Sequence, residues 1–148
     1  MRNSEATTLK SPKVYFRDTG ILHQMLGVRS EPELLTHPKS GASWAGYVVE
    51  EALKAAEPDE AYFWATHAGA ELDLLLFKEG RRLGVECKRV DAPRLTRSMH
   101  IALQDLELDH LVVIYPGQRA YPLADRVIVA PLTQLAQGGE AILFPKAR

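Results

Sequence analysis

The chain has 148 residues and a net charge of −1, with 46% hydrophobic and 25% charged residues, which is typical of one soluble domain rather than a wholly basic nucleic-acid binder. No stretch approaches the roughly 18 apolar residues of a membrane helix, and residues 1–10 lack the apolar centre of a secretory signal. The absence of such a stretch predicts no membrane partner. The lone Cys87 cannot form an internal disulfide, and together with the polar N-terminus this leads us to expect a cytoplasmic protein.

The first forty residues predict a polar extension over residues 1–10 and a helical lead-in over residues 11–40. Residues 18–27 predict a short helix, because Asp18 is a capping residue and Gly27 ends the segment. A second short helix is expected over residues 32–36.

Residues 43–56 predict a longer helix, with Ser43 as its N-cap and Pro58 beyond its end. With successive residues about 100° apart, Ala45 lies in the middle of a broad apolar face and Glu51 lies at the edge of that face. We therefore expect this helix to pack on a sheet with Glu51 near the contact.

Three strands follow, over residues 62–67, 71–77 and 82–89, and they predict an antiparallel meander. The remaining elements are a helix over residues 93–106, a buried central strand at 110–115, a short strand at 126–130 and a helix at 131–137. The predicted fold class is α/β, a mixed sheet flanked by helices in one domain over residues 11–138. Residues 139–148 are expected to be a C-terminal tail.

The hairpin between the second and third strands brings charged residues together. If Glu79 and Gly80 are its two loop residues, paired positions place Asp73 opposite Glu86. Period-two alternation then sets one charged face against an apolar one. The charged face holds Glu71, Asp73, Glu86 and Lys88, and the core-facing residues are Leu72, Leu74, Leu76, Val85 and Cys87.

Two facing carboxylates destabilise an antiparallel pair unless a positive charge lies between them. Mg²⁺ or Mn²⁺ is suited to such oxygen ligands, so we predict a metal site formed by Asp73 and Glu86, with the Cys87 carbonyl as a third ligand. Lys88 then orients the attacking water and stabilises developing charge. The alternative is a solvent-facing hairpin whose acids and lysine pair across strands.

Other groups near this site have simpler interpretations. His67 and His100 are isolated histidines, which are usually surface groups rather than ligands. Cys87 alternates inward, as a small buried apolar residue does. The arginines clustered over residues 81–97 predict a DNA-binding patch, although a solvated basic face gives the same pattern. The members of this patch are Arg81, Arg82, Arg89, Arg94 and Arg97.

Several segments together carry a family resemblance. They are residues 11–20 (SPKVYFRDTG), 41–44 (GASW), 63–64 (FW), 66–73 (THAGAELD) and 85–88 (VECK). As a set they resemble the C-terminal domain of prokaryotic AAA-type ATPases, a domain of unknown function counted among PD-(D/E)XK nuclease-like folds. The resemblance implies a restriction-endonuclease-like sheet, and ATPase and winged-helix modules of the same parent protein as partners. The chain itself has no phosphate-binding Gly-x-x-x-x-Gly-Lys-Ser/Thr loop.

Two positions depart from the family pattern. The family usually has Glu after the Trp of GASW and Arg after the Trp of FW, whereas this chain has Ala45 and Ala65. The resemblance implies that the missing glutamate would complete the acidic site, for which Glu51 is the nearby substitute. We therefore expect a nuclease-like DNA-binding domain with a weakened site. The alternative is a non-catalytic module that binds nucleic acid or protein and serves the ATPase.

Overall fold

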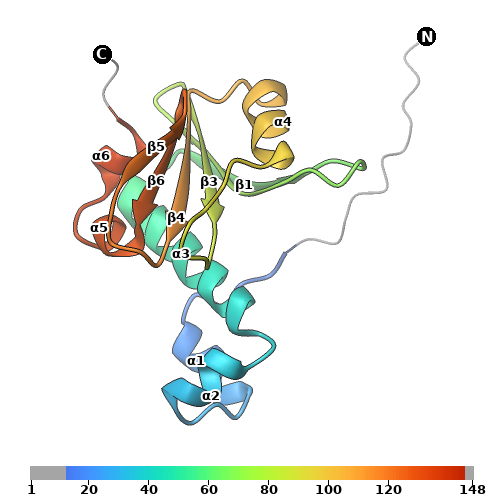
Figure 1. Ribbon diagram of the computed structural model, residues 1–148, viewed down its shortest axis with the longest axis vertical. Helices are drawn as coiled ribbons and strands as arrows, with labels where there is room; N and C mark the ends of the chain where they lie inside the picture. The colour runs from blue at the N-terminus through green and yellow to red at the C-terminus, as the bar shows by residue number, and fades with distance from the viewer. Residues whose placement is uncertain (1–12, 146–148) are drawn as a thin grey trace.

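A six-stranded mixed sheet forms the centre of the structure (Figure 1). Its strands are β1 (Glu60–Ala65), β2 (Glu71–Lys78), β3 (Arg81–Cys87), β4 (His110–Tyr115), β5 (Tyr121–Ala124) and β6 (Val127–Pro131). The computed structural model describes residues 13–145, and within them the spatial order is β1-β2-β3-β4-β6-β5. β1, β2 and β3 are antiparallel neighbours, and β4 runs parallel to both β3 and β6. The predicted meander and the central position of β4 are confirmed.

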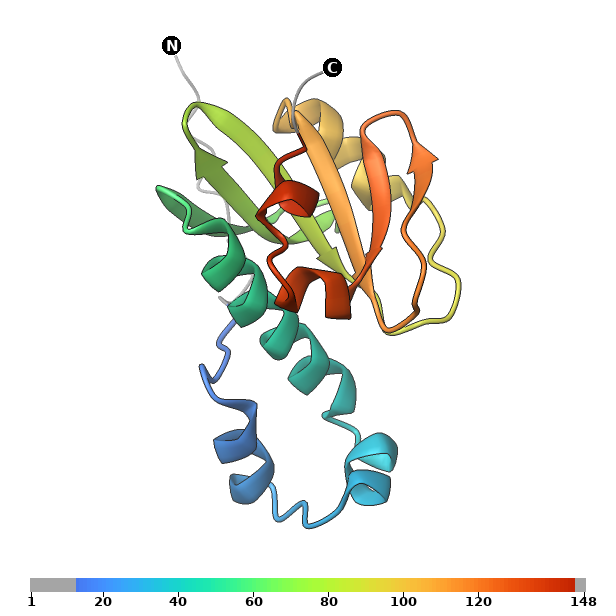
Figure 2. The same cartoon turned by 90° about the vertical axis from the view of Figure 1, so that its left-hand side faces the viewer.

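Helices cover both faces of the sheet. They are α1 (Thr19–Met25), α2 (Glu31–Thr36), α3 (Ser40–Ala56), α4 (Arg97–Asp105), α5 (Leu132–Ala136) and α6 (Glu140–Leu143). α3, α5 and α6 bury Val48, Leu135 and Leu143 against one face, and α4 buries Met99 and Leu103 against the other. Figure 2 shows α3 running across the sheet, with α1 and α2 extending beyond its N-terminal end. The predicted α/β layering is therefore confirmed.

The β2–β3 hairpin has the predicted register. Lys78 lies opposite Arg81, so Glu79 and Gly80 form a two-residue loop. Both loop residues have positive φ, 50° and 76°, as a type I′ turn requires. The same register continues along the hairpin to the pair Leu74 and Val85.

A β-bulge in β2 changes the face of one predicted core residue. The register between β1 and β2 shifts by one residue, so that Asp73 and Leu74 lie opposite Phe63 alone. As a result Leu72 packs in the cluster under α4, whereas Leu74 packs in the cluster under α3. The prediction that Leu72 and Leu74 share a face is wrong, because simple alternation does not include the extra residue.

Two helices begin at residues other than those predicted. α3 begins at Ser40 rather than Ser43, and Ser43, inside the helix, is buried with its hydroxyl 2.6 Å from His23 Nε2. α4 begins at Arg97 rather than residue 93, and the Thr96 hydroxyl accepts a hydrogen bond from the Met99 N–H at its start. The predicted boundaries fail where a capping residue is used for tertiary contact or lies one turn later.

Residues after α5 also belong to the packed domain. α6 lies within the segment expected to be a tail, and Leu143 and Phe144 are buried with the α3-side core. β5 was not predicted because it is a four-residue edge strand containing Pro122. The predicted extension over residues 1–10 lies outside the described residues. Within residues 13–145 no helix is both long and apolar enough to cross a membrane.

Candidate metal-binding site

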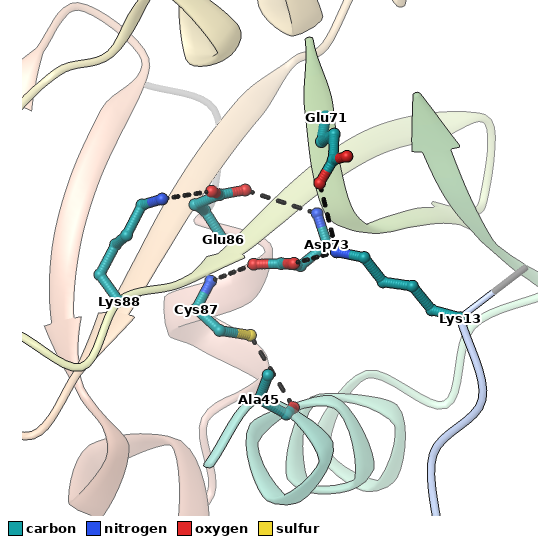
Figure 3. Close-up of polar contacts among 7 residues, drawn as sticks. All are labelled: Lys13, Ala45, Glu71, Asp73, Glu86, Cys87 and Lys88. Carbon is teal, nitrogen blue, oxygen red and sulfur yellow. Dashed lines mark hydrogen bonds and ion pairs between the residues drawn. The ribbon is translucent and has the colours of Figure 1, made fainter. Parts of the chain in front are cut away.

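The predicted acidic residues meet where β2 and β3 separate. The ladder between these strands ends at Leu74 and Val85, and the next residues of β3, beginning with Glu86, continue to pair with β4. The bulge places Asp73 at the opening between the strands. Figure 3 shows Asp73, Glu86 and Lys88 converging there. The predicted juxtaposition of these three residues is therefore present.

Side chains replace the missing ladder hydrogen bonds in this opening. The Cys87 N–H donates to Asp73 Oδ2 at 2.9 Å, and the Asp73 N–H donates to Glu86 Oε2 at 3.4 Å. Each carboxylate thus binds the backbone of the opposite strand. This reciprocal arrangement fixes the two acids beside each other without a direct cross-strand ladder pair.

Glu86 is a buried carboxylate that lies beside a second acid, Asp73, and pairs with Lys88. Its side chain is 9% exposed and forms an ion pair with Lys88 Nζ at 2.8 Å. Burial, and next the neighbouring Asp73 charge, raise the pKa of Glu86, although Lys88 acts in the opposite direction. Burial acts to lower the pKa of Lys88, but Glu86 more than offsets it, so that the Lys88 pKa is raised. The lysine is therefore a charged partner that only partly compensates the acids.

Lys13 is a site residue that neither periodicity nor spacing in the sequence predicts. Its ammonium lies 3.1 Å from Asp73 Oδ1 and 3.5 Å from Glu71 Oε2, on the side of Asp73 away from Lys88 (Figure 3). Lys13 precedes Asp73 by 60 residues in a segment outside regular secondary structure. No periodicity links the two, so the resemblance over residues 11–20 was the one available signal.

Helix α3 approaches the same opening at Ala45. The Cys87 Sγ lies 4.0 Å from the Ala45 carbonyl oxygen, so the backbone of α3 at position 45 lies beside Cys87, on the sheet side of the helix as its apolar pattern predicts. Burial raises the pKa of Cys87 well above its ordinary value, which agrees with a buried apolar role rather than a nucleophile. Ala65 pairs across the sheet with Glu71. Ala45 and Ala65, the two positions that depart from the family pattern, thus lie next to Cys87 and Glu71, respectively.

Glu51 is not brought into this cluster. Its carboxylate accepts a hydrogen bond from Lys54 Nζ at 2.9 Å on the same helix. His67 and His100 are exposed. Within residues 13–145 no group of three or more His, Cys, Asp or Glu side chains is placed to hold a metal ion. The acids that converge are therefore the strand pair, Asp73 and Glu86.

The predicted arginine patch is divided along β3. Arg81 and Arg82 begin the strand and donate to backbone carbonyls of the same chain, whereas Arg89 lies two residues beyond its end. At about 3.3 Å per residue these positions are roughly 25 Å apart. Arg94 and Arg97 are exposed between β3 and the start of α4. The arginines thus do not form one compact patch. Arg89, Arg94 and Arg97 come after the acidic residues along the chain, beyond the C-terminal end of β3.

A family model described as "Domain of unknown function (DUF4143)" matches residues 40–135. The chain belongs to this family. The DUF4143 match includes Ala45, Asp73, Glu86 and Lys88, while Lys13 lies before it. The family assignment therefore covers the two acids and Lys88 but not the lysine that contacts Asp73.

Relatives of this DUF4143 chain occur in mycobacteria. Uncharacterized proteins of Mycobacterium tuberculosis and Mycobacterium bovis are each 44% identical to it over 130 residues, which is 88% of this chain. The same match spans 30% of each relative, so the chain corresponds to less than a third of their length. No solved structure matches the chain.

Proposed function

We propose that this DUF4143 domain is a metal-dependent, nuclease-like module of the PD-(D/E)XK type that acts on DNA, with a weakened active site. The observation that carries the proposal is the convergence of Asp73, Glu86 and Lys88 where β2 leaves β3. Two acids and a lysine at one sheet opening suit phosphodiester hydrolysis, in which both the phosphate charge and the attacking water must be controlled. A restriction-endonuclease-like arrangement of the mixed sheet is part of the proposal.

The residues present fit a hard divalent cation such as Mg²⁺ or Mn²⁺. Such ions are often held by one or two carboxylates together with substrate phosphate. The raised pKa of Glu86, caused by burial and then by Asp73, identifies a place where additional positive charge is favourable. The Lys88 N–H donates toward β4, so the preceding carbonyl, that of Cys87, is expected to point toward Asp73 as a further oxygen ligand.

Each residue has a separate role in the proposed reaction. Asp73 and Glu86 hold the ion, which when bound supplies Lewis-acid chemistry for phosphodiester hydrolysis. The Lys88 side chain is 34% exposed and its ammonium pairs with Glu86 at 2.8 Å, so it contacts both Glu86 and solvent. It therefore orients the attacking water and stabilises negative charge on the phosphate.

The proposed weakening of the metal site results from the residues that α3 presents near it. Ala45 faces the opening but carries no carboxylate, and Glu51 pairs with Lys54 instead. We propose that the site consequently holds its ion with two carboxylates. Slow cleavage or nicking is then the expected activity.

A plasmid-nicking assay tests this function. Wild-type protein should nick supercoiled DNA in Mn²⁺ or Mg²⁺ but not in chelator, and Asp73→Asn and Lys88→Ala should each abolish nicking. Lys54→Ala is the matched control, because it removes a lysine from a surface ion pair outside the site. Absence of nicking by the wild type with either metal would contradict the enzymatic part of the proposal.

The second candidate is a non-catalytic module that binds nucleic acid or protein and serves an attached ATPase. It is favoured by Lys13, which already neutralises Asp73, and by Ala45. Salt-dependent DNA binding that is unchanged in Asp73→Asn would support this role. We propose ATPase and winged-helix modules as partners within the parent protein. Absence of DNA binding at low salt would favour a protein partner.

A further inference from the structure

Lys13 occupies a position suited to a cation beside Asp73. Its ammonium lies 3.1 Å from Asp73 Oδ1 and 3.5 Å from Glu71 Oε2, and it lies over the Phe63 ring at 4.6 Å from the centroid. Two carboxylate oxygens and an aromatic face thus surround the Lys13 ammonium.

The segment that carries Lys13 is anchored on α3. Tyr15 is half-buried against the core, and its ring packs so closely on Gly46 that an added Cβ there would lie 3.1 Å from Tyr15 Cδ1. Val14 and Phe16, on either side of Tyr15, are exposed. We call residues 13–16 the strap. It lies outside regular secondary structure and has one inward anchor, Tyr15, close to Lys13 in the chain.

The strap and a metal ion require the same carboxylate oxygen. Asp73 Oδ2 accepts the Cys87 N–H, so Oδ1 is the oxygen left for a ligand, and Lys13 holds it. A divalent ion bound to Oδ1 would lie within a few ångströms of the Lys13 ammonium, at a distance where like charges repel strongly. The Lys13 ammonium and a divalent ion therefore compete for Asp73 Oδ1.

We propose that Lys13 is the resident cation of this site and that a divalent metal ion enters only by displacing it. The strap is then an autoinhibitory gate, closed when Lys13 contacts Asp73 and open when the strap moves. This inference rests on the proposed metal site. It adds a competitor from a part of the chain that precedes the DUF4143 match.

Calorimetric Mn²⁺ titration of matched lysine variants tests the gate. Lys13→Gln removes the competing charge and should bind Mn²⁺ at least about tenfold more tightly than wild type, as expected for loss of a nearby like charge. Lys13→Arg retains the charge and should keep the wild-type affinity. Lys54→Gln, which removes a lysine from the Glu51 ion pair, should also match wild type. Circular dichroism verifies that each variant is folded.

A second variant opens the strap without changing its charge. Tyr15→Ala removes the anchor on Gly46 and should also tighten Mn²⁺ binding. If wild type binds Mn²⁺ and Asp73→Asn does not, but Lys13→Gln and Tyr15→Ala bind no more tightly than wild type, the gate is wrong and the metal site stands. If neither wild type nor Lys13→Gln binds Mn²⁺, the proposed metal site itself is contradicted.

Discussion

The backbone N–H of Cys87 donates to the Asp73 carboxylate at 2.9 Å, so that a side chain occupies the place of a ladder carbonyl where β2 and β3 part. One carboxylate oxygen thus has a structural role and the other faces the site. This division allows the structural and electrostatic contributions of Asp73 to be separated by mutation.

Asp73→Ala should destabilise the fold more than Asp73→Asn. The alanine leaves the buried Cys87 N–H without an acceptor, a loss of about 1–3 kcal/mol, whereas the asparagine oxygen can still accept that hydrogen bond. Both variants lose the partly exposed ion pair with Lys13, which contributes at most about 1 kcal/mol. Urea unfolding measures the difference, and equal free energies of unfolding for the two variants would argue against a structural role for this hydrogen bond.

Glu86→Gln should stabilise the metal-free protein at neutral pH relative to wild type. The pKa of Glu86 is raised in the folded state by burial and then by Asp73, so its contribution to stability is full below the ordinary glutamate pKa and is lost as pH rises through the raised value. Thermal unfolding in chelator from pH 4 to 8 should show wild type and variant converging at the acidic end. A difference that is independent of pH would contradict this explanation.

Ala45→Glu should strengthen the metal site. Position 45 approaches Cys87, so a carboxylate there can add a third acidic ligand, and we expect Mn²⁺ affinity to rise about tenfold. Tyr47→Glu is the control, because Tyr47 is exposed on the same helix and lines a pocket that contains neither Asp73 nor Glu86. Equal Mn²⁺ affinities for the two variants would show that position 45 does not complete the site.

Arg94→Ala/Arg97→Ala should weaken DNA binding and its salt dependence. Both arginines are exposed after the C-terminal end of β3, and each lost phosphate contact should reduce the slope of log affinity against log salt by about 0.9. The pair Arg81→Ala/Arg82→Ala, at the other end of the strand, should weaken binding less. Fluorescence anisotropy with a labelled duplex at several salt concentrations gives both slopes, and equal effects of the two pairs would contradict the division of the patch.

The hairpin geometry was predictable because its determinants are local. Glu79 and Gly80 specify a two-residue turn, and that turn fixes the register that brings Asp73 near Glu86. The apolar run of β4 likewise predicted a strand covered on both faces. These signals lie within a few residues of the structures that they specify.

The remaining features depend on contacts between distant segments. The bulge at Asp73 depends on pairing with β1, and no local residue type announces it. Lys13 reaches Asp73 through the packing of Tyr15 on Gly46. The helix α6 is four residues long and is stabilised by burial of Leu143 in the core rather than by its own sequence. Periodicity and residue spacing in the sequence do not reveal such contacts between distant segments.

The central claim is that Asp73 and Glu86 hold a divalent cation, and a calorimetric Mn²⁺ titration of metal-free wild type and Asp73→Asn tests it most directly. The variant retains the hydrogen-bond acceptor for Cys87 and removes the charge. We predict that wild type binds Mn²⁺ and that affinity in Asp73→Asn falls by at least about tenfold, as for loss of a metal-site group. Equal Mn²⁺ affinity in the two proteins, or no binding to either wild type or Lys13→Gln, would contradict the claim.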